Sequence, residues 1–238
     1  MRWLIGLAIL ATPAMAVTCE DINYLGASYT VCEVSLGEDL QLFLRDDEGE
    51  ILGSFSAVEN NENRDLLFAM NAGMYHDDRS PVGHYIEDGV QEMRVIPSAG
   101  PGNFGLLPNG VFCIGDSFRV YETLDYLARK PNCTYATQSG PMLVIDGALH
   151  PRFIADGTSM NLRNGVGTTT DGTRAVFAIS NEPVNFHDFG TLFRDRLALP
   201  NALFFDGSIS RLYAPSLNRS DFGFGQLGPI VGVLDAGQ

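Results

Sequence analysis

Short apolar runs separated by acidic, glycine-containing turns recur along most of the chain. The turns lie at residues 46–49, 88–89, 146–147 and 171–172. Their apolar arms are residues 40–45 and 51–55, 85–86 and 90–95, 142–145 and 148–149, and 166–170 and 175–179. Asp-Gly between apolar segments is typical of a β-hairpin. Because a hairpin joins antiparallel neighbours, this pattern predicts largely antiparallel sheets.

Helical spacing of apolar residues is rarer. Residues 122–129 have a helical pattern that Pro131 would end. A clearer helix is predicted after Asn185, whose side chain is suited to cap it, with Asp188 in the first turn. Its apolar positions recur three or four residues apart, at Phe186, Phe189, Phe193 and Leu197.

The segment after this helix completes the expected architecture. Pro200 ends the helix, and residues 202–205 (Ala-Leu-Phe-Phe) predict a buried strand that delivers Asp206 to its end. Many hairpins with few helices predict an α+β fold, a single domain of antiparallel-rich mixed β-sheets with flanking helices. Residues 17–238 contain no linker, repeat or low-complexity tract, so we expect one domain there.

The first sixteen residues differ from the rest. Arg2 precedes a short apolar stretch, and Ala14-Met15-Ala16 forms a small-x-small ending before Val17. This pattern is typical of a cleavable signal peptide over residues 1–16, because the stretch is too short to span a membrane. We therefore expect a periplasmic or secreted protein without a membrane span.

Charge limits the partners of this protein. Without residues 1–16 the chain has 14 basic and 29 acidic residues, a net charge of −15. Such a surface repels nucleic acid and anionic membranes at long range. An anionic substrate would need a local cluster of positive charge, and all but one of the basic residues are arginine, which is suited to bidentate oxyanion contacts.

Four cysteines lie in the expected mature chain: Cys19, Cys32, Cys113 and Cys133. An even number in an exported protein predicts two disulfides. Three pairings are open, and the sequential one, Cys19–Cys32 and Cys113–Cys133, is favoured. Each bond would then close a short loop and contribute about 3 kcal/mol. No Cys-x-x-Cys or paired Cys/His spacing supports zinc.

Several segments place glycine and small polar residues at the end of a short apolar run. They are residues 68–75, 107–112, 138–147, 163–167 and 201–211. Glycine at a strand end lets backbone approach a ligand closely. Five such strand ends in one chain predict one convergent pocket.

These segments, in this order, resemble the phosphodiester glycosidase family from about Leu66 to Val233. The family includes the uncovering-enzyme domain, which removes N-acetylglucosamine from a sugar phosphodiester, and a bacterial periplasmic branch. The resemblance is strongest in Ser139-Gly-Pro, Arg163-Asn-Gly-Val-Gly and Asp206-Gly-Ser. The uncovering-type enzymes usually carry Asp-Gly-Gly-Gly-Ser where this chain has Asp206-Gly-Ser-Ile-Ser210. The resemblance therefore implies the fold more strongly than the substrate.

Asp206 is the first candidate for catalysis. A carboxylate that follows four apolar residues is partly desolvated, which raises its pKa unless hydrogen bonds compensate. From the motif alone, a turn-capping Asp is an equally good interpretation, and the resemblance favours function. Glu182, in a loop that leads into a helix, is the first candidate for a second carboxylate, ahead of Asp77 or Asp78, although an exposed Glu is the commoner role for such a residue.

Substrate binding is assigned to polar groups of the same motifs. Arg163 and Arg211 are the candidate anion clamp, because each lies where backbone N–H groups can also reach an anion. Other hydrogen-bonding groups for sugar or phosphate are Asn71, Asn109, Gln138, Ser139, Asn164 and Ser208. Each of these residues alone is more often a turn or cap residue, so only the whole set supports a binding site.

No cofactor is expected. The four histidines lack metal-ligand spacing, and calcium stays open in so acidic an exported protein without a motif to indicate it. The resulting hypothesis is an exported hydrolase that cleaves a glycosidic bond next to a phosphodiester on a cell-envelope or polysaccharide substrate. The alternative is a non-catalytic periplasmic glycan- or phosphate-binding protein on the same fold. A metal-dependent hydrolase using the histidines ranks third.

Overall fold

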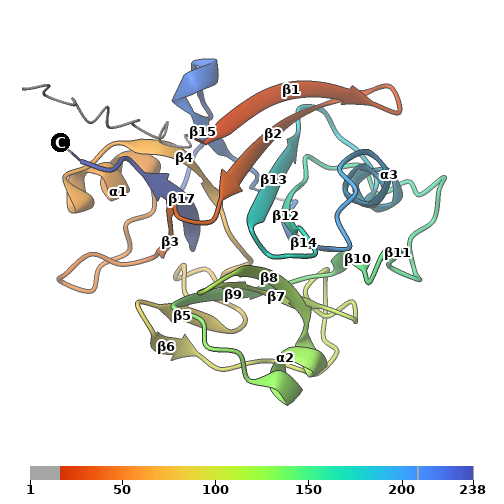
Figure 1. The fold of residues 1–238 in the computed structure, drawn as a ribbon, viewed down its shortest axis with the longest axis horizontal. Helices are drawn as coiled ribbons and strands as arrows, with labels where there is room; N and C mark the ends of the chain where they lie inside the picture. The colour runs from red at the N-terminus through yellow and green to blue at the C-terminus, as the bar shows by residue number, and fades with distance from the viewer. Residues whose placement is uncertain (1–16, 208, 238) are drawn as a thin grey trace, which may run out of the picture.

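The structure is a computed structural model that describes residues 17–207 and 209–237. Three sheets surround a shared core, and a short helix covers the outer side of each (Figure 1). All pairs of neighbouring strands in the three sheets are antiparallel. The predicted α+β class is therefore confirmed.

The largest sheet has seven strands in the order β1-β2-β13-β12-β14-β10-β11. Their bounds are β1 Thr18–Tyr24, β2 Ala27–Ser35, β10 Met142–Ile145, β11 Ala148–Leu149, β12 Asn164–Thr168, β13 Arg174–Ser180 and β14 Asn201–Asp206. The predicted buried strand before Asp206 is thus β14, which lies between β12 and β10.

The other two sheets have five strands each. One has the order β16-β15-β4-β17-β3, with β3 Asp39–Phe43, β4 Leu66–Asn71, β15 Leu212–Ala214, β16 Arg219–Ser220 and β17 Ile230–Leu234. The other has the order β6-β5-β9-β7-β8, with β5 Tyr85–Glu87, β6 Val90–Met93, β7 Gly110–Ile114, β8 Phe118–Glu122 and β9 Tyr135–Ser139.

Two of the three helices follow the sequence prediction. Helix α2 (Thr123–Arg129) is capped by the Glu122 carboxylate. Helix α3 (Phe186–Thr191) begins at Asn185, whose Oδ1 accepts from Asp188 N at 2.8 Å, and continues as a wider turn over Leu192–Arg196. Helix α1 (Phe55–Glu62) was not predicted, because its weakly amphipathic sequence buries only Phe55 and Val58.

Three of the four predicted hairpins are present, and one prediction is wrong in its second arm. The β5–β6, β10–β11 and β12–β13 pairs are antiparallel neighbours. After the turn at residues 46–49, however, only a single bridge joins Arg45 to Ile51. Ser54 then caps α1 through a bond from Ala57 N, so Phe55 opens a helix, and β3 pairs with β17 instead.

The core lies where the three sheets meet. Phe177 of β13 contacts Phe68 of β4 and Phe112 of β7, with ring centroids 4.9 Å and 5.8 Å apart. Phe112 also contacts Phe205 of β14 at 6.4 Å. These rings are fully buried, so one apolar cluster holds together strands from all three sheets.

The two disulfides have the predicted pairing. Cys19–Cys32 joins directly opposed residues of β1 and β2, and Cys113–Cys133 ties β7 to the segment before β9. Such bonds are typical of a chain that folds in an oxidising compartment. Within the described residues no helix is long and apolar enough to cross a membrane. The predicted signal peptide, residues 1–16, lies outside the described residues.

Candidate active site

Strand ends from two sheets meet at a pair of buried asparagines. Asn71 ends β4, Asn164 begins β12, and Asp206 ends β14. Asn164 Nδ2 donates to Asn71 O at 2.8 Å and to Asn71 Oδ1 at 3.1 Å, and its Oδ1 accepts from Asp206 N at 3.0 Å. The two side chains therefore fix the place where Asp206 leaves its sheet.

The loop after Asp206 is held by the same asparagines. Asn71 Oδ1 accepts from Arg211 N at 2.9 Å, and Ser210 Oγ donates to Asp206 O at 3.0 Å. The Asp206 carboxylate accepts from Gly207 N at 2.6 Å, and the side chain is 9% exposed. Asp206 is thus a nearly buried carboxylate on a closely braced turn. Ser208 lies outside the described residues.

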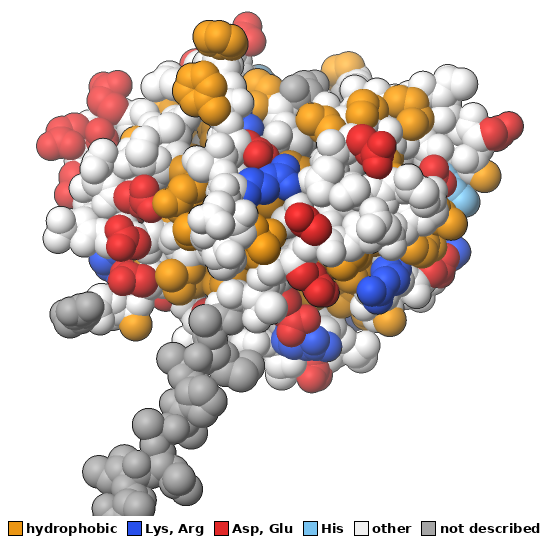
Figure 2. Space-filling model, turned by 90° about the horizontal axis from the view of Figure 1, so that it is seen from above, with side chains coloured by type: hydrophobic (Ala, Val, Ile, Leu, Met, Phe, Trp, Pro, Cys, Tyr) orange, Lys and Arg blue, Asp and Glu red, His pale blue; other side chains and the backbone are white. Residues whose placement is uncertain are grey.

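Two hollows lie on either side of residues 221–227. The first, here called the β14 groove, has a volume of about 660 Å³ and is lined by Leu162, Ile179, Ser180, Asn181, Gly207, Ile209, Ser210, Arg211, Arg219, Asp221, Phe222, Gly223 and Phe224. The second, the α1 cavity, has a volume of about 430 Å³ and includes Phe55, Glu59 and Tyr213 in its wall. Figure 2 shows one face of the molecule, on which basic and acidic side chains lie close together among hydrophobic ones.

Arg211 lines both hollows. Its Nη1 donates to Gly225 O at 3.1 Å and its Nη2 to Phe224 O at 3.2 Å, so two carbonyls of the 221–227 loop occupy the guanidinium. Asp221 also lines both hollows, and its carboxylate pairs with Arg219 at 2.8 Å. Neither Asp221 nor Arg219 was predicted, because no motif marks them in the sequence.

Tyr75 and Arg79 are further residues of this region that the sequence did not single out. Burial raises the pKa of Tyr75, and the negative charge of Asp206 raises it further. The Arg79 guanidinium lies over the Tyr75 ring, 5.2 Å from its centroid. A Cβ at Gly228 would lie 2.5 Å from that ring, so the glycine leaves room for Tyr75. Tyr75 is therefore a neutral hydroxyl close to Asp206.

Arg163 is a fully buried arginine. Its guanidinium stacks on Phe186 at 3.6 Å, Nε donates to Val184 O at 2.9 Å, and Nη2 donates to Ser159 O at 2.8 Å. Burial lowers its pKa to about 10. Nη1 would be 3.6 Å from a Cβ at Gly207, which places it behind the groove wall. Arg211 lines the groove and Arg163 lies beneath it, so their shared anion clamp stays a prediction.

Four buried polar atoms in this region have no hydrogen-bond partner: Asn71 Nδ2, Tyr75 Oη, Arg79 Nε and Arg163 Nη1. All four carry hydrogen. An unsatisfied buried donor costs about 1–3 kcal/mol, and that cost is removed when an acceptor arrives. Such a set around one carboxylate is suited to an acceptor-rich, anionic ligand.

Three predicted binding residues have hydrogen bonds inside the fold, and their role in binding stays a prediction. Ser139 Oγ donates to Phe205 O at 2.8 Å, which supports the end of β14. The Gln138 amide bonds to Ile96, His84 and Thr123, and the Asn109 amide to Phe104 and Thr123. Both amides are buried and bonded, which is a structural role in the β9 and β7 region.

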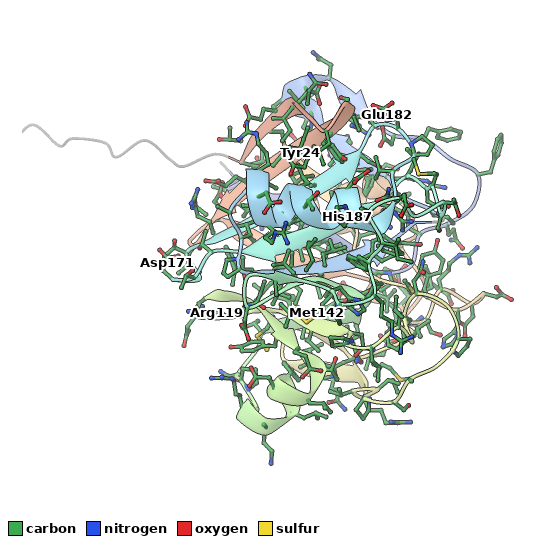
Figure 3. All side chains as sticks on the ribbon, turned by 90° about the vertical axis from the view of Figure 1, so that its right-hand side faces the viewer. Tyr24, Arg119, Met142, Asp171, Glu182 and His187 are labelled. Carbon is green, nitrogen blue, oxygen red and sulfur yellow. A yellow bond between two sulfur atoms is a disulfide. The ribbon has the colours of Figure 1, made fainter. Side chains whose placement is uncertain are left out.

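Glu182, the predicted second carboxylate, points elsewhere. It is exposed, and its Oε1 accepts from Ser28 N at 2.8 Å, at the tip of the β1–β2 hairpin (Figure 3). It is not among the described residues that line the β14 groove. Its catalytic role stays a prediction without geometric support.

The contacts of His84 and His187 are with different partners and do not form a common site. His84 Nε2 lies 3.0 Å from the Tyr126 hydroxyl and its Nδ1 2.8 Å from Met93 O, and burial lowers its pKa. His187 pairs with Asp188 on α3. In the part of the chain that the structure describes, no group of three or more His, Cys, Asp or Glu side chains is placed to hold a metal.

Comparisons with known proteins identify the family of this chain. Residues 64–229, which include Asn71, Arg163, Asn164, Asp206 and Arg211, match the phosphodiester glycosidase family. The chain belongs to that family. It is 33% identical to YigE of Escherichia coli over 213 residues, which cover 87% of this chain and 83% of YigE.

A solved structure shares the fold. The catalytic domain of zebrafish N-acetylglucosamine-1-phosphodiester alpha-N-acetylglucosaminidase, auto-inhibited by its pro-peptide, aligns with a TM-score of 0.62 and 15% identity. The alignment covers 92% of this chain and 82% of the zebrafish domain. The common fold is therefore retained at low sequence identity.

Proposed function

We propose that this protein is an exported hydrolase that cleaves the glycosidic bond of a sugar 1-phosphodiester in a cell-envelope or polysaccharide substrate. The observation that carries the proposal is the set of unpartnered donors around Asp206. Such donors suit a phosphodiester, and Asp206 is the nearby carboxylate. Membership of the phosphodiester glycosidase family and the activity named for the zebrafish enzyme support the same reaction.

The geometry suggests a division of roles. Arg211, Tyr75 and Arg79 would bind the phosphate oxygens, while the Asp206 carboxylate would stabilise or attack the anomeric carbon as positive charge develops there. The bond between that carbon and its phosphate oxygen breaks, and the oxygen leaves with the bonding electrons. Water supplies the new hydroxyl on the sugar, and its other proton goes to solvent or to the phosphomonoester.

Protonation of the leaving oxygen by an acid contributes little to this reaction. A departing phosphate is a weak base, so a proton donor on the leaving oxygen adds little. One carboxylate with a strong anion site is then sufficient. Because the carbonyls of Phe224 and Gly225 occupy Arg211, binding of phosphate there requires these two hydrogen bonds to open.

Export is proposed from two independent features. The first is the signal-like pattern of residues 1–16. The second is the pair of disulfides. A periplasmic or secreted location would expose the protein to envelope glycans.

The decisive test is turnover by purified residues 17–238 of sugar 1-phosphodiesters, with and without a chelator, for wild type and Asp206→Asn. Asparagine keeps the shape and an acceptor for Gly207 N but removes the charge. We expect the rate to fall by at least about two orders of magnitude, as for loss of an acid, base or charge-stabilising group. Asp195→Asn, a surface variant next to Arg194, is the matched control.

Other outcomes would point elsewhere. An active, folded Asp206→Asn enzyme would move the chemistry away from Asp206, and Glu182→Gln would then be measured next. Tight binding of the diesters without turnover would favour the glycan- or phosphate-binding protein. Loss of turnover on chelation alone would favour a metal-dependent hydrolase.

A further inference from the structure

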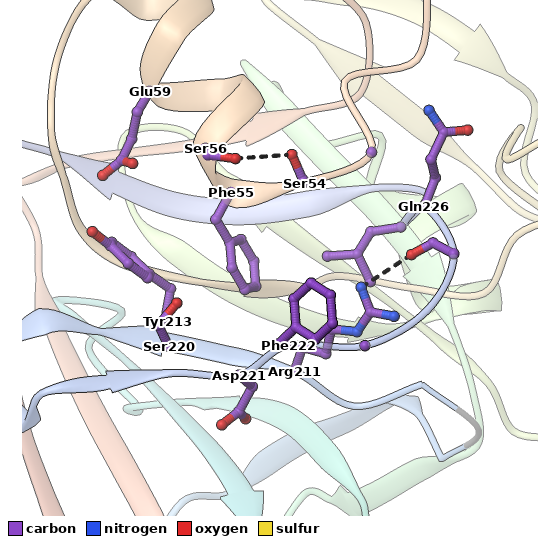
Figure 4. A pocket seen from close by; sticks show the side chains of 14 residues that line it. Ser54, Phe55, Ser56, Glu59, Arg211, Tyr213, Ser220, Asp221, Phe222 and Gln226 are labelled. Carbon is purple, nitrogen blue, oxygen red and sulfur yellow. Dashed lines mark hydrogen bonds between the residues drawn. The ribbon is translucent and has the colours of Figure 1, made fainter.

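The α1 cavity is walled by aromatic rings. Phe55 at the start of α1 and Tyr213 of β15 lie with ring centroids 5.9 Å apart, and Phe222 stands at the mouth, 89% exposed (Figure 4). A ring this exposed buries little apolar surface, so it contributes little to the stability of the fold. The faces of aromatic rings attract cations.

Charged side chains of both signs line this cavity: Arg211, Glu59 and Asp221, whose carboxylate pairs with Arg219. In Figure 4 the rings of Phe55 and Phe222 lie between the Arg211 guanidinium and the Glu59 carboxylate. Glu59 Oε1 accepts from Leu66 N at 3.2 Å. Its charge also helps to raise the pKa of Tyr213, after burial, so the carboxylate and this ring lie together.

We propose that the α1 cavity binds a zwitterionic alkylammonium phosphate of the choline or ethanolamine type. The phosphate would lie at Arg211, and the ammonium group would lie among Phe55, Tyr213 and Phe222 with Glu59 behind them. The inference rests on the proposed function in one respect: this group would be the leaving side of the diester, while the sugar occupies the β14 groove. Arg211 lines both spaces, as a shared phosphate site requires.

Long-range charge favours a zwitterion over other occupants. The expected mature chain carries a net charge of −15, which repels a phosphodiester whose other substituent is neutral. A zwitterion has no net charge, and its cation is attracted by Glu59. A neutral sugar ring would leave that carboxylate without a role in recognition.

Direct titration tests the cavity without any need for turnover. Residues 17–238 would be titrated calorimetrically with phosphocholine, phosphoethanolamine and glycerol 3-phosphate. We expect phosphocholine to bind at least about tenfold more tightly than glycerol 3-phosphate, because the latter lacks the cation. The difference between the two ammonium compounds shows whether a quaternary or a primary ammonium group fits better.

Two variants and two matched controls locate the binding. Glu59→Gln and Phe222→Ala should each weaken phosphocholine binding about five- to tenfold and leave glycerol 3-phosphate binding unchanged. Glu62→Gln removes a charge from the same helix outside the cavity, and Leu124→Ala removes a 60% exposed apolar side chain of α2 that lines neither hollow. Both controls should bind phosphocholine like wild type.

The outcomes separate this inference from the proposed function. Equal affinity for phosphocholine and glycerol 3-phosphate, or equal effects of the variants and their controls, would overturn the cavity assignment even in an active glycosidase. Binding only to phosphatidylcholine vesicles, and not to soluble phosphocholine, would also overturn it. Phosphocholine binding that depends on Glu59, together with no hydrolysis of any diester, would refute the glycosidase and leave the cavity assignment supported.

Discussion

At the scale of single residues, asparagine hydrogen bonds and the missing Cβ of glycine explain why these residue types occur in the motifs. Asn164 connects Asn71 to the backbone of Asp206, which is why an amide is useful there. A Cβ at Gly140 would lie 2.6 Å from Asn109 Cβ, and one at Gly165 would lie 2.5 Å from Leu203 O. These motif residues thus position the turn at Asp206.

Tyr75 gives a test that separates a substrate contact from a structural role. Tyr75→Phe removes a buried hydroxyl that has no partner, so the free energy of unfolding should stay the same or rise slightly. If the hydroxyl donates to phosphate, kcat/KM for a sugar phosphodiester should fall at least about tenfold. Kinetics and thermal melts of the variant would check both.

Tyr121→Phe is the matched control for that experiment, because Tyr121 is a partly exposed tyrosine of β8. It should leave kcat/KM unchanged. A Tyr75→Phe enzyme with normal kinetics would remove Tyr75 from the binding site and leave only its packing against Arg79 and Gly228.

At the scale of elements, local sequence signals correctly predicted most hairpin turns. Asp88 and Gly89 both have positive φ, 49° and 75°, and so do Asp146 and Gly147, 46° and 83°. Two successive residues with positive φ are what a tight hairpin turn requires, and Asp-Gly tolerates it. The sequence could predict these elements because each depends on neighbours only a few positions away.

The cap of α3 can be tested by mutation. Asn185 Oδ1 accepts from Asp188 N, and Asn185 Nδ2 donates to Ala155 O at 3.3 Å. Asn185→Ala should lower the free energy of unfolding by about 1 kcal/mol, measured by denaturant titration. Asn185→Asp keeps the capping oxygen and should lose less. Equal losses in the two variants would show that the cap contributes nothing.

The disulfide that joins β7 to the segment before β9 should stabilise the protein, because the loop it closes restricts the unfolded chain. The cysteines are 20 positions apart, and a loop of this length contributes about 3 kcal/mol. Mass spectrometry after alkylation without reduction should find no free thiol. The double variant Cys113→Ala, Cys133→Ala should unfold at lower denaturant concentration. Four alkylated cysteines in native protein would contradict both the pairing and the proposed export.

At the scale of the whole molecule, three sheets meet around one core, and they also bury an acid. Glu87 of β5 accepts from the Tyr85 hydroxyl at 2.7 Å. Its pKa is raised from 4.5 to about 7, mainly by burial and also by the nearby charges of Asp88 and Glu92, although bonds from Tyr85 and Leu44 N oppose the shift. The folded state thus binds this proton more tightly than the unfolded chain does.

The sign of the pH effect follows from that difference. The protonated carboxyl stabilises the fold fully below about pH 4.5, and this contribution is lost as the pH rises to about 7. We expect its size to be on the order of 2 kcal/mol. Gln cannot ionise, so the difference in free energy of unfolding between wild type and Glu87→Gln should change by about that amount from pH 4 to pH 8. Parallel pH profiles would show that Glu87 ionises normally.

The sequence by itself determined three of the four hairpins, two helices, the strand before Asp206 and the likeness to a family. For the cysteines it left three pairings open, and the structure shows the favoured one, with Cys19 opposite Cys32 across β1 and β2. Caps, turns and apolar periodicity are local, so they can be seen in a linear sequence.

Only the tertiary structure decided what the polar side chains of the motif segments do. It turned Gln138 and Asn109 into internal braces, directed Glu182 to the β1–β2 hairpin, and buried Arg163 under Gly207. It also brought Tyr75 and Arg79 to Asp206, although no sequence pattern joins them. The reason is that a side chain's partners depend on which segments the fold brings side by side, and these can be far apart in the sequence, as Ser28 and Glu182 are, 154 positions apart.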